Sequence, residues 1–433
     1  MKRLIALYIL TAASTAVAQG SGNVLPLKRC LELAMKQSPQ TKAYSAELEA
    51  ALIGAESDKP IALPKVYLIA SGGIQGPGSK LDVPGMVENV TVPQTSGRVG
   101  IRLDQPLYRA GLSAARSRYL ALRSVATANW QEEMSALALS VITDYNSLLQ
   151  AQAGVAQAER GLGEAQQFLL LVKQQIAAGL GKPVDVGAAN SAVAEAQAGL
   201  QRAKDGVLLA RYNLNRQIGR PFSSPISGEL TDVSAADPLS TEQYVALALK
   251  QRPELALLRA RIKEAAAGRT LASDQSMPQL SLRVEADEQT PTALQREHYA
   301  AVMVHFKWPL LDRGKAHRDA QVAALQVIRL KSLLSNAETG IELDVIHQSQ
   351  LLDECRANLH SAVVSKDAAA AEERVALVSY QVGKGSAMDL QKSLHTLWQS
   401  RDALEAARIA ILNSVASLRH SAGQDVPDRG VVQ

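Results

Sequence analysis

Leu33-Ala34-Met35-Lys36-Gln37-Ser38-Pro39 recurs 214 positions later as Leu247-Ala248-Leu249-Lys250-Gln251-Arg252-Pro253. Two further sets of residues recur in the same order, at offsets of 203 and 204: Pro106–Gly111 returns as Pro309–Gly314, and Gly179, Gly181, Asp185, Leu214 and Gly219 return as Gly383, Gly385, Asp389, Leu418 and Gly423. Matches in one order at nearly constant spacing indicate an internal duplication. We therefore predict a first repeat over residues 19–225, a second repeat over 226–423 and a C-terminal tail over 424–433.

Residues 1–18 have the pattern of a secretory signal peptide. A charged start, Met1–Arg3, precedes the apolar run Leu4–Ala13 and the small residues Ala16-Val17-Ala18. This order favours a cleaved leader over a buried first helix. No later stretch reaches the ~18 uninterrupted apolar residues of a membrane-spanning helix. We expect an exported protein that does not cross a bilayer by helices.

Composition and motifs argue against several function classes. The formal net charge of +4 falls to about +2 when Lys2 and Arg3 leave with the leader, which does not suggest a nucleic-acid partner. Cys30 and Cys355 are better explained as two isolated residues than as a disulfide framework, although an oxidising compartment would let them pair.

No Walker loop, G-x-S-x-G, H-E-x-x-H or C-x-x-C motif is present, so we do not expect an enzyme. All seven histidines lie in the second repeat, without the i, i+4 spacing of helical metal ligands. We expect neither a metal site nor a cofactor. The histidines are His298, His305, His317, His347, His360, His395 and His420.

Each repeat contains a long stretch without proline, 107–182 in the first and 310–426 in the second. Proline in a helix interior costs about 3 kcal/mol, so these stretches allow long helices. A glycine pair inside each stretch is the natural place for the chain to turn back. Each repeat is therefore expected to hold a helix of nearly 70 residues, about 100 Å long, and a returning helix.

The returning helices carry apolar and small residues at alternating steps of three and four, which predicts a coiled-coil seam. The seam residues are Val193, Ala196, Leu200, Ala203, Val207, Ala210 and Leu214 in the first repeat, and Leu397, Ser400, Leu404, Ala407, Ile411, Ser414 and Leu418 in the second.

Before each long helix, a period of two replaces the helical period. Val66–Gly72, Arg98–Asp104, Gln279–Asp287 and Ala300–Trp308 suggest four strands, in hairpins at about 64–108 and 278–310. One face is apolar and the other is charged. This pattern fits either a small sheet packed on helices or strands that face lipid on one side and water on the other. In lipid an open four-stranded sheet is not allowed, and three chains would close a barrel of about twelve strands around an aqueous bore.

The duplicated order of helix, hairpin, long helix and returning helix resembles the TolC-like outer-membrane efflux protein family. So do the turn motifs Ala178–Asp185 and Tyr380–Asp389. The resemblance implies a mainly α chain with a small β part, its coiled-coil helices forming a periplasmic α-barrel below a trimeric twelve-stranded outer-membrane β-barrel. It implies an exit duct in the Gram-negative outer membrane, extending into the periplasm. The expected partners are two sister subunits, outer-membrane lipid, a periplasmic adaptor and an inner-membrane pump of an efflux or type I secretion system.

The resemblance also assigns site residues. Asp389 matches an acidic ring at the pore constriction, where Lys392 replaces the family's second acid. Asp185 and Tyr380 match two members of a latch that holds the entrance closed, with Lys384 as a possible basic partner. Asp185 would also suit a helix N-terminus as a cap.

The turns themselves are the expected adaptor-docking tips: Gly179, Leu180 and Gly181 in the first repeat, and Gly383, Lys384, Gly385 and Ser386 in the second. The rival interpretation is a periplasmic coiled-coil scaffold or adaptor without a membrane barrel.

Overall fold

A computed structural model of the chain describes residues 24–57, 59, 63–74, 80–81, 90–91, 95–229, 239–289 and 297–424. The predicted signal peptide lies outside these residues. So do the predicted C-terminal tail beyond Gln424 and most of the loops that connect the hairpin strands.

The two repeats have the same order of main elements. The first contains α1 (Leu27–Gln37), α2 (Pro39–Ser57), β1 (Lys65–Ile74), β4 (Thr95–Arg109), α3 (Leu112–Ala177) and α4 (Asp185–Gln217). The second contains α5 (Thr241–Gln251), α6 (Pro253–Asp274), β5 (Gln279–Gln289), β6 (His298–Lys307), α7 (Lys315–Gln381) and α8 (Ala387–Ser421). The short pair β2 (Lys80–Leu81) and β3 (Val90–Thr91) has no counterpart among the described residues of the second repeat.

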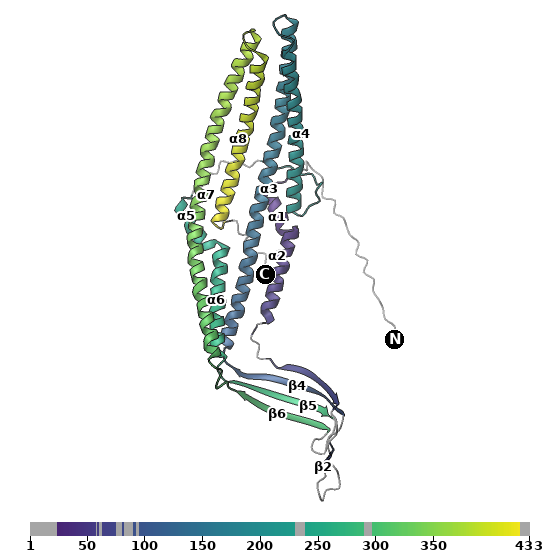
Figure 1. The fold of residues 1–433 in the computed structure, drawn as a ribbon, viewed down its shortest axis with the longest axis vertical. Helices are drawn as coiled ribbons and strands as arrows, with labels where there is room; N and C mark the ends of the chain where they lie inside the picture. The colour runs from purple at the N-terminus through teal and green to yellow at the C-terminus, as the bar shows by residue number, and fades with distance from the viewer. Residues whose placement is uncertain are drawn as a thin grey trace, which may run out of the picture. The chain divides into compact units, whose positions relative to one another are not determined.

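Two compact units divide the chain, and each draws on both repeats. Unit 1 contains residues 1–42, 136–238 and 348–418, and unit 2 contains residues 43–135, 239–347 and 419–433. Each duplicated half therefore contributes to both units. In unit 1, α4 lies beside α3 and α8 lies beside α7 (Figure 1). We refer to these pairs as the α3/α4 hairpin and the α7/α8 hairpin.

The helix expected before each strand pair is split in two by a proline. Ser38, which precedes Pro39, has an extended backbone with φ −57° and ψ 138°. Arg252, which precedes Pro253, has φ −58° and ψ 127°. Proline disfavours the α conformation in the residue before it, so α1 and α5 end two residues before the prolines that begin α2 and α6, with Ser38 and Arg252 between them.

The long helices run without interruption for 66 residues in α3 and 67 residues in α7, as predicted from the absence of proline. The predicted seams of α4 and α8 are confirmed, because every seam residue is buried or half-buried.

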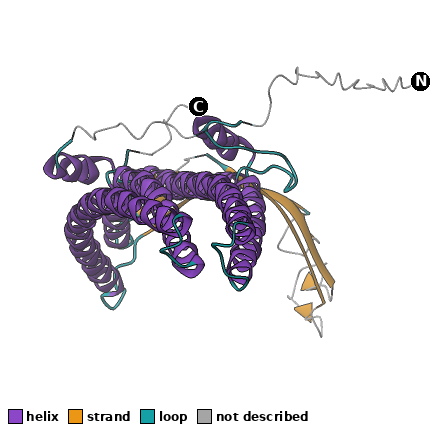
Figure 2. Cartoon of the chain, turned by 90° about the horizontal axis from the view of Figure 1, so that it is seen from above, coloured by secondary structure: helices purple, strands orange, loops and turns teal. Residues whose placement is uncertain are grey.

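The four long strands pair antiparallel in the order β1-β4-β5-β6, so the hairpin of each repeat joins the other through β4 and β5 (Figure 1). Figure 2 shows the strands in orange. The apolar face is exposed and is not packed on helices: Leu68 is 78% exposed and Val302 is 71% exposed. Along the described strands, β1 and β6 each have a neighbour on one side only.

The charged face is held together by ion pairs between β4 and β5. Arg98 Nε lies 2.5 Å from Asp287 Oδ2, Arg102 Nε lies 2.6 Å from Glu285 Oε1, and Arg283 Nε lies 2.8 Å from Asp104 Oδ1. Three positive and three negative side chains pair across the two strands. The cluster is therefore neutral, although every member of it is charged.

Candidate functional site: the hairpin tips and the gate residues

Each hairpin turns back through the same hydrogen-bonded motif. In the first, Leu180 N–H donates to the carbonyl of Gln175 at 2.9 Å, and Gly179 N–H donates to that of Ile176 at 3.0 Å. In the second, Lys384 N–H donates to Ser379 at 2.9 Å, and Gly383 N–H donates to Tyr380 at 3.0 Å. This is the Schellman motif, which satisfies the last carbonyls of a helix.

Glycine is required at the turns for two different reasons. Gly179 and Gly383 have φ of +77° and +70°, the left-handed conformation that other residues adopt only at a cost. Gly181 and Gly385 are needed for close approach instead, since a Cβ would lie 2.9 Å from Ile176 Cγ1 in the first case and 3.0 Å from the backbone nitrogen of Tyr380 in the second.

The predicted latch residues Asp185 and Tyr380 are in contact. The Tyr380 hydroxyl donates to Asp185 Oδ2 at 3.4 Å, and this bond joins the start of α4 to the last turn of α7. Tyr380 is 4% exposed, and its ring meets Phe168 of α3 edge to face with centroids 6.4 Å apart. Burial, and then the charge of Asp185, raise the pKa of the Tyr380 phenol, so it stays a donor.

Asp185 has a second role in its own hairpin. Its Oδ2 also accepts a hydrogen bond from the backbone N–H of Lys182 at 3.2 Å, which fastens the turn to the first residue of α4. The Asp185 carboxylate thus accepts from two donors, so the interpretation as a local cap and the interpretation as a latch member are compatible. Lys384 is not brought to it: the Lys384 side chain is exposed, with no hydrogen bond or ion pair to any part of the chain that the structure describes.

The predicted constriction residues lie on the first two turns of α8. Asp389 and Lys392 are both exposed and are one helical turn apart. Ser386 precedes α8 as its N-cap: its hydroxyl donates to Asp389 Oδ2 at 2.7 Å and accepts from Asp389 N–H at 3.1 Å. The Asp389 side chain is therefore oriented by the cap of its own helix.

Apolar side chains gather around the two turns and are left uncovered. Leu180, Val184, Val382 and Met388 are between 61% and 76% exposed. Only Leu180 was predicted as a tip residue from the sequence. The other three were missed because each is a single apolar residue beside a turn, which is not unusual on its own.

Behind the turns, the two hairpins share one apolar core. It includes Phe168 and Val172 of α3, Ala192 of α4, Tyr380 of α7 and Leu394 of α8. Tyr380 therefore belongs both to the core and to the polar link with Asp185. Cys30 and Cys355 are free in this structure, and burial raises the pKa of the Cys30 thiol to about 11.

No helix among the described residues is both long enough and apolar enough to cross a membrane. The described part of the chain also holds no group of three His, Cys, Asp or Glu residues arranged to bind a metal ion.

Comparison with known proteins identifies the fold. The model of the outer membrane efflux protein family matches residues 30–220 and 244–424. The solved outer-membrane channel OprN is 18% identical with a TM-score of 0.76, over 92% of this chain and 90% of that one. VceC of Vibrio cholerae is 18% identical with a TM-score of 0.75, over 92% and 96%.

A third solved structure, the outer membrane channel CmeC of Campylobacter jejuni, is 15% identical with a TM-score of 0.75, over 92% of this chain and 86% of that one. At these identities the structures show the fold alone. A search of curated protein sequences found no match. Because the family match covers most of both repeats, the chain belongs to the outer membrane efflux protein family and is a TolC-like channel protein of the outer membrane.

Proposed function

We propose that this chain is one third of a homotrimeric exit duct for an inner-membrane pump, reached through a periplasmic adaptor, in a tripartite efflux pump or a type I secretion system. The observation that carries the proposal is the sheet. It has an exposed apolar face, a charged face and an outer edge at each of β1 and β6. Three copies joined edge to edge would give twelve strands around an aqueous bore, with the apolar face toward lipid.

The two hairpins would form the periplasmic end of the duct. The exposed apolar side chains around the turns provide a surface for the adaptor, and the Schellman turns keep that surface narrow. The link between Tyr380 and Asp185 would hold the two hairpins together in the closed state. Three copies of Asp389 and Lys392 around the three-fold axis would then line the constriction.

The duct is tested on mature protein purified in detergent. Light scattering is expected to give the mass of a trimer, and planar lipid bilayers are expected to show discrete channels. A monomer that needs no detergent and produces no conductance would favour the periplasmic scaffold and overturn the proposal.

The latch is tested separately with the double variant Asp185→Ala, Tyr380→Phe. Removing a hydrogen bond to a charged group is expected to shift the closed-to-open equilibrium by about 10- to 150-fold, which corresponds to the roughly 1.5–3 kcal/mol of such a bond. Single-channel recordings should show a larger mean conductance. Lys384→Gln is the matched control, because its side chain makes no contact with Asp185. A double variant with the closed conductance of the wild type would remove the latch.

A further inference from the structure

A second polar contact joins the two hairpins, away from the tips. Glu164 of α3 accepts two hydrogen bonds from α8: one from Trp398 Nε1 and one from an Arg401 terminal nitrogen, both at 2.7 Å. The Glu164 and Arg401 side chains are 29% and 25% exposed, so the ion pair is partly shielded from water. We call Glu164, Trp398 and Arg401 the clasp.

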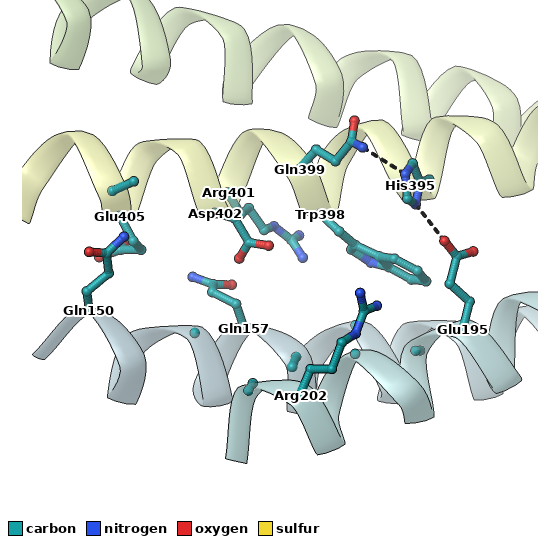
Figure 3. Close-up of a pocket in the computed structure, with 17 residues that line it drawn as sticks. Gln150, Gln157, Glu195, Arg202, His395, Trp398, Gln399, Arg401, Asp402 and Glu405 are labelled. Atoms are coloured by element: carbon teal, nitrogen blue, oxygen red, sulfur yellow. Dashed lines mark hydrogen bonds and ion pairs between the residues drawn. The ribbon is translucent and has the colours of Figure 1, made fainter. Parts of the chain in front are cut away.

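The backbone of α3 is shaped to receive the clasp. Gly161, one turn before Glu164, lies under the Trp398 ring, and a Cβ there would be 3.4 Å from the indole. A larger side chain would lift the ring off α3 and move Nε1 away from the carboxylate. Beside the clasp, His395 Nδ1 of α8 lies 3.5 Å from Glu195 Oε1 of α4, and the His395 ring meets Trp398 edge to face (Figure 3).

Cavities lie on both sides of the clasp. At this level the contact between α8 and α3 therefore does not rest on close packing alone. A cavity of about 360 Å³ between α3, α4 and α8 is lined by Trp398 and Arg401 together with Gln157, Arg202 and Asp402 (Figure 3). A second cavity of about 380 Å³, between α3, α7 and α8, is lined by Glu164, Arg401 and Glu373. Arg401 borders both. At this level the clasp joins α8 to α3 between the two cavities.

The charges around the clasp make Arg401 its central member. Burial, and then the charge of Glu164, raise the pKa of Glu373 on α7, whereas Arg401 acts in the opposite direction. Arg401 therefore binds Glu164 directly and also acts electrostatically on Glu373, which lines the same cavity. Without Arg401 the two carboxylates would face each other in a partly buried site with only Arg374 of α7 to compensate.

Given the proposed duct, on which this inference rests, we propose that the clasp is a second tether that holds the α7/α8 hairpin to the α3/α4 hairpin and keeps the entrance closed. It is separate from the link between Asp185 and Tyr380, because it joins α3 to α8, whereas that link joins α4 to α7. Trp398 lies about 14 Å along α8 from Asp389, at the 1.5 Å rise of an α-helix. Movement of the α7/α8 hairpin away from the α3/α4 hairpin would therefore have to break the clasp as well as the tip link.

The test uses Arg401→Gln in full-length trimers in planar bilayers, with Arg408→Gln as the matched control. Arg408 pairs with Glu405 within α8 and does not reach the other hairpin. Arg401→Gln is expected to raise the open-to-closed ratio about tenfold, as for loss of a hydrogen-bonded charge pair. Arg401→Lys should stay close to wild type because it keeps the charge. Glu164→Gln should have a smaller effect, because it keeps the bond from Trp398 and removes the repulsion with Glu373.

A second variant distinguishes the loss of this specific contact from a general loosening of the helix packing. Adding Glu373→Gln to Arg401→Gln removes the carboxylate that repels Glu164 but does not restore the bond between α3 and α8, so it is expected to recover only the part of the closed state that was lost to repulsion. Equal conductance of Arg401→Gln and Arg408→Gln would overturn the clasp. If the wild type conducts in the same experiment, the proposed duct still stands. Absence of conductance in the wild type would instead overturn the duct.

Discussion

At the scale of single residues, the two gate carboxylates differ in how they are held. Asp185 accepts hydrogen bonds from the other hairpin and from its own turn, whereas Asp389 accepts one from the cap of its own helix. Under the proposed function, we therefore expect Asp389 to act through its charge and Asp185 to act through its contacts. This difference was not visible in the sequence, where the two residues occupy equivalent positions of the repeat.

We predict that the ion preference of the proposed channel depends on Lys392. In a trimer, three Asp389 carboxylates and three Lys392 ammonium groups would contribute opposite charges of equal size, one helical turn apart, so we expect weak selectivity in the wild type. Lys392→Gln removes the basic ring and keeps the acidic ring of Asp389, so the channel should prefer cations. The reversal potential in a salt gradient measures this. Lys366→Gln, on α7, is the control, and an unchanged potential in Lys392→Gln would show that position 392 does not line the pore.

Asp312 gives the second repeat a helix start that depends on pH. Its carboxylate accepts hydrogen bonds from the N–H groups of Ala316 and Gly314, which hold its pKa below the ordinary range. A lowered pKa means that the stabilisation is complete above the ordinary value of about 3.9 and is lost as the pH falls below it.

Hydrogen exchange in the first turn of α7 should therefore be faster in Asp312→Asn than in wild type at neutral pH, and the difference should shrink in acid. Asp319→Asn, one turn further on, is the control. A difference that did not depend on pH would show that the charge of Asp312 contributes nothing.

At the scale of elements, the same turn chemistry ends all four hairpin helices, but the tips and the opposite ends differ in their surroundings. Gly219, after α4, has φ +72°, and a Cβ there would lie 2.6 Å from the carbonyl oxygen of Gln37 at the end of α1. Gly423, after α8, has the same φ, and a Cβ there would lie 3.1 Å from the backbone of Arg252. The tip glycines Gly179 and Gly383 have no such neighbour within 4 Å.

Alanine substitutions at Gly179 and Gly219 separate the cost of a left-handed backbone from the cost of a steric collision. Gly179→Ala should lower the free energy of unfolding by only about 1–2 kcal/mol, the cost of placing a non-glycine residue in the left-handed conformation. Gly219→Ala should cost about 1–3 kcal/mol more, because it adds a collision with α1. Urea unfolding followed by circular dichroism measures both. Equal losses of stability at the two positions would show that α1 moves aside at no cost when a side chain is added at Gly219.

At the scale of the whole molecule, the proposed assembly of chains depends on the two faces of the sheet. Its two faces are assigned by neighbouring residues on β6: Val302 pairs with Val284 on the apolar face, and Ala301 pairs with Glu285 on the charged face. Lysine at a lipid-facing midplane position costs about 2–4 kcal/mol, whereas lysine toward an aqueous lumen costs little.

Val302→Lys should therefore reduce trimers in the outer-membrane fraction, while Ala301→Lys, beside Glu285, should leave them near the wild-type amount. Semi-native electrophoresis of membrane fractions compares the two. The reverse order would mean that the faces of the sheet are exchanged.

Much of this architecture was predictable because its signals are local. The absence of proline predicted α3 and α7, and steps of three and four predicted the seams of α4 and α8. Alternation predicted the strands. The breaks before Pro39 and Pro253 also had a local signal, since each proline restricts the residue before it, although a single helix was expected there.

The sequence by itself determined the duplication, the elements and the turn glycines, because each depends on conformational preferences within a few residues. Only the tertiary structure decided which side chains meet across the hairpins. Glu164 and Arg401 are 237 positions apart, and their contact depends on how far α8 is shifted along α3. The packing of whole helices sets that shift, and no short segment of sequence specifies it.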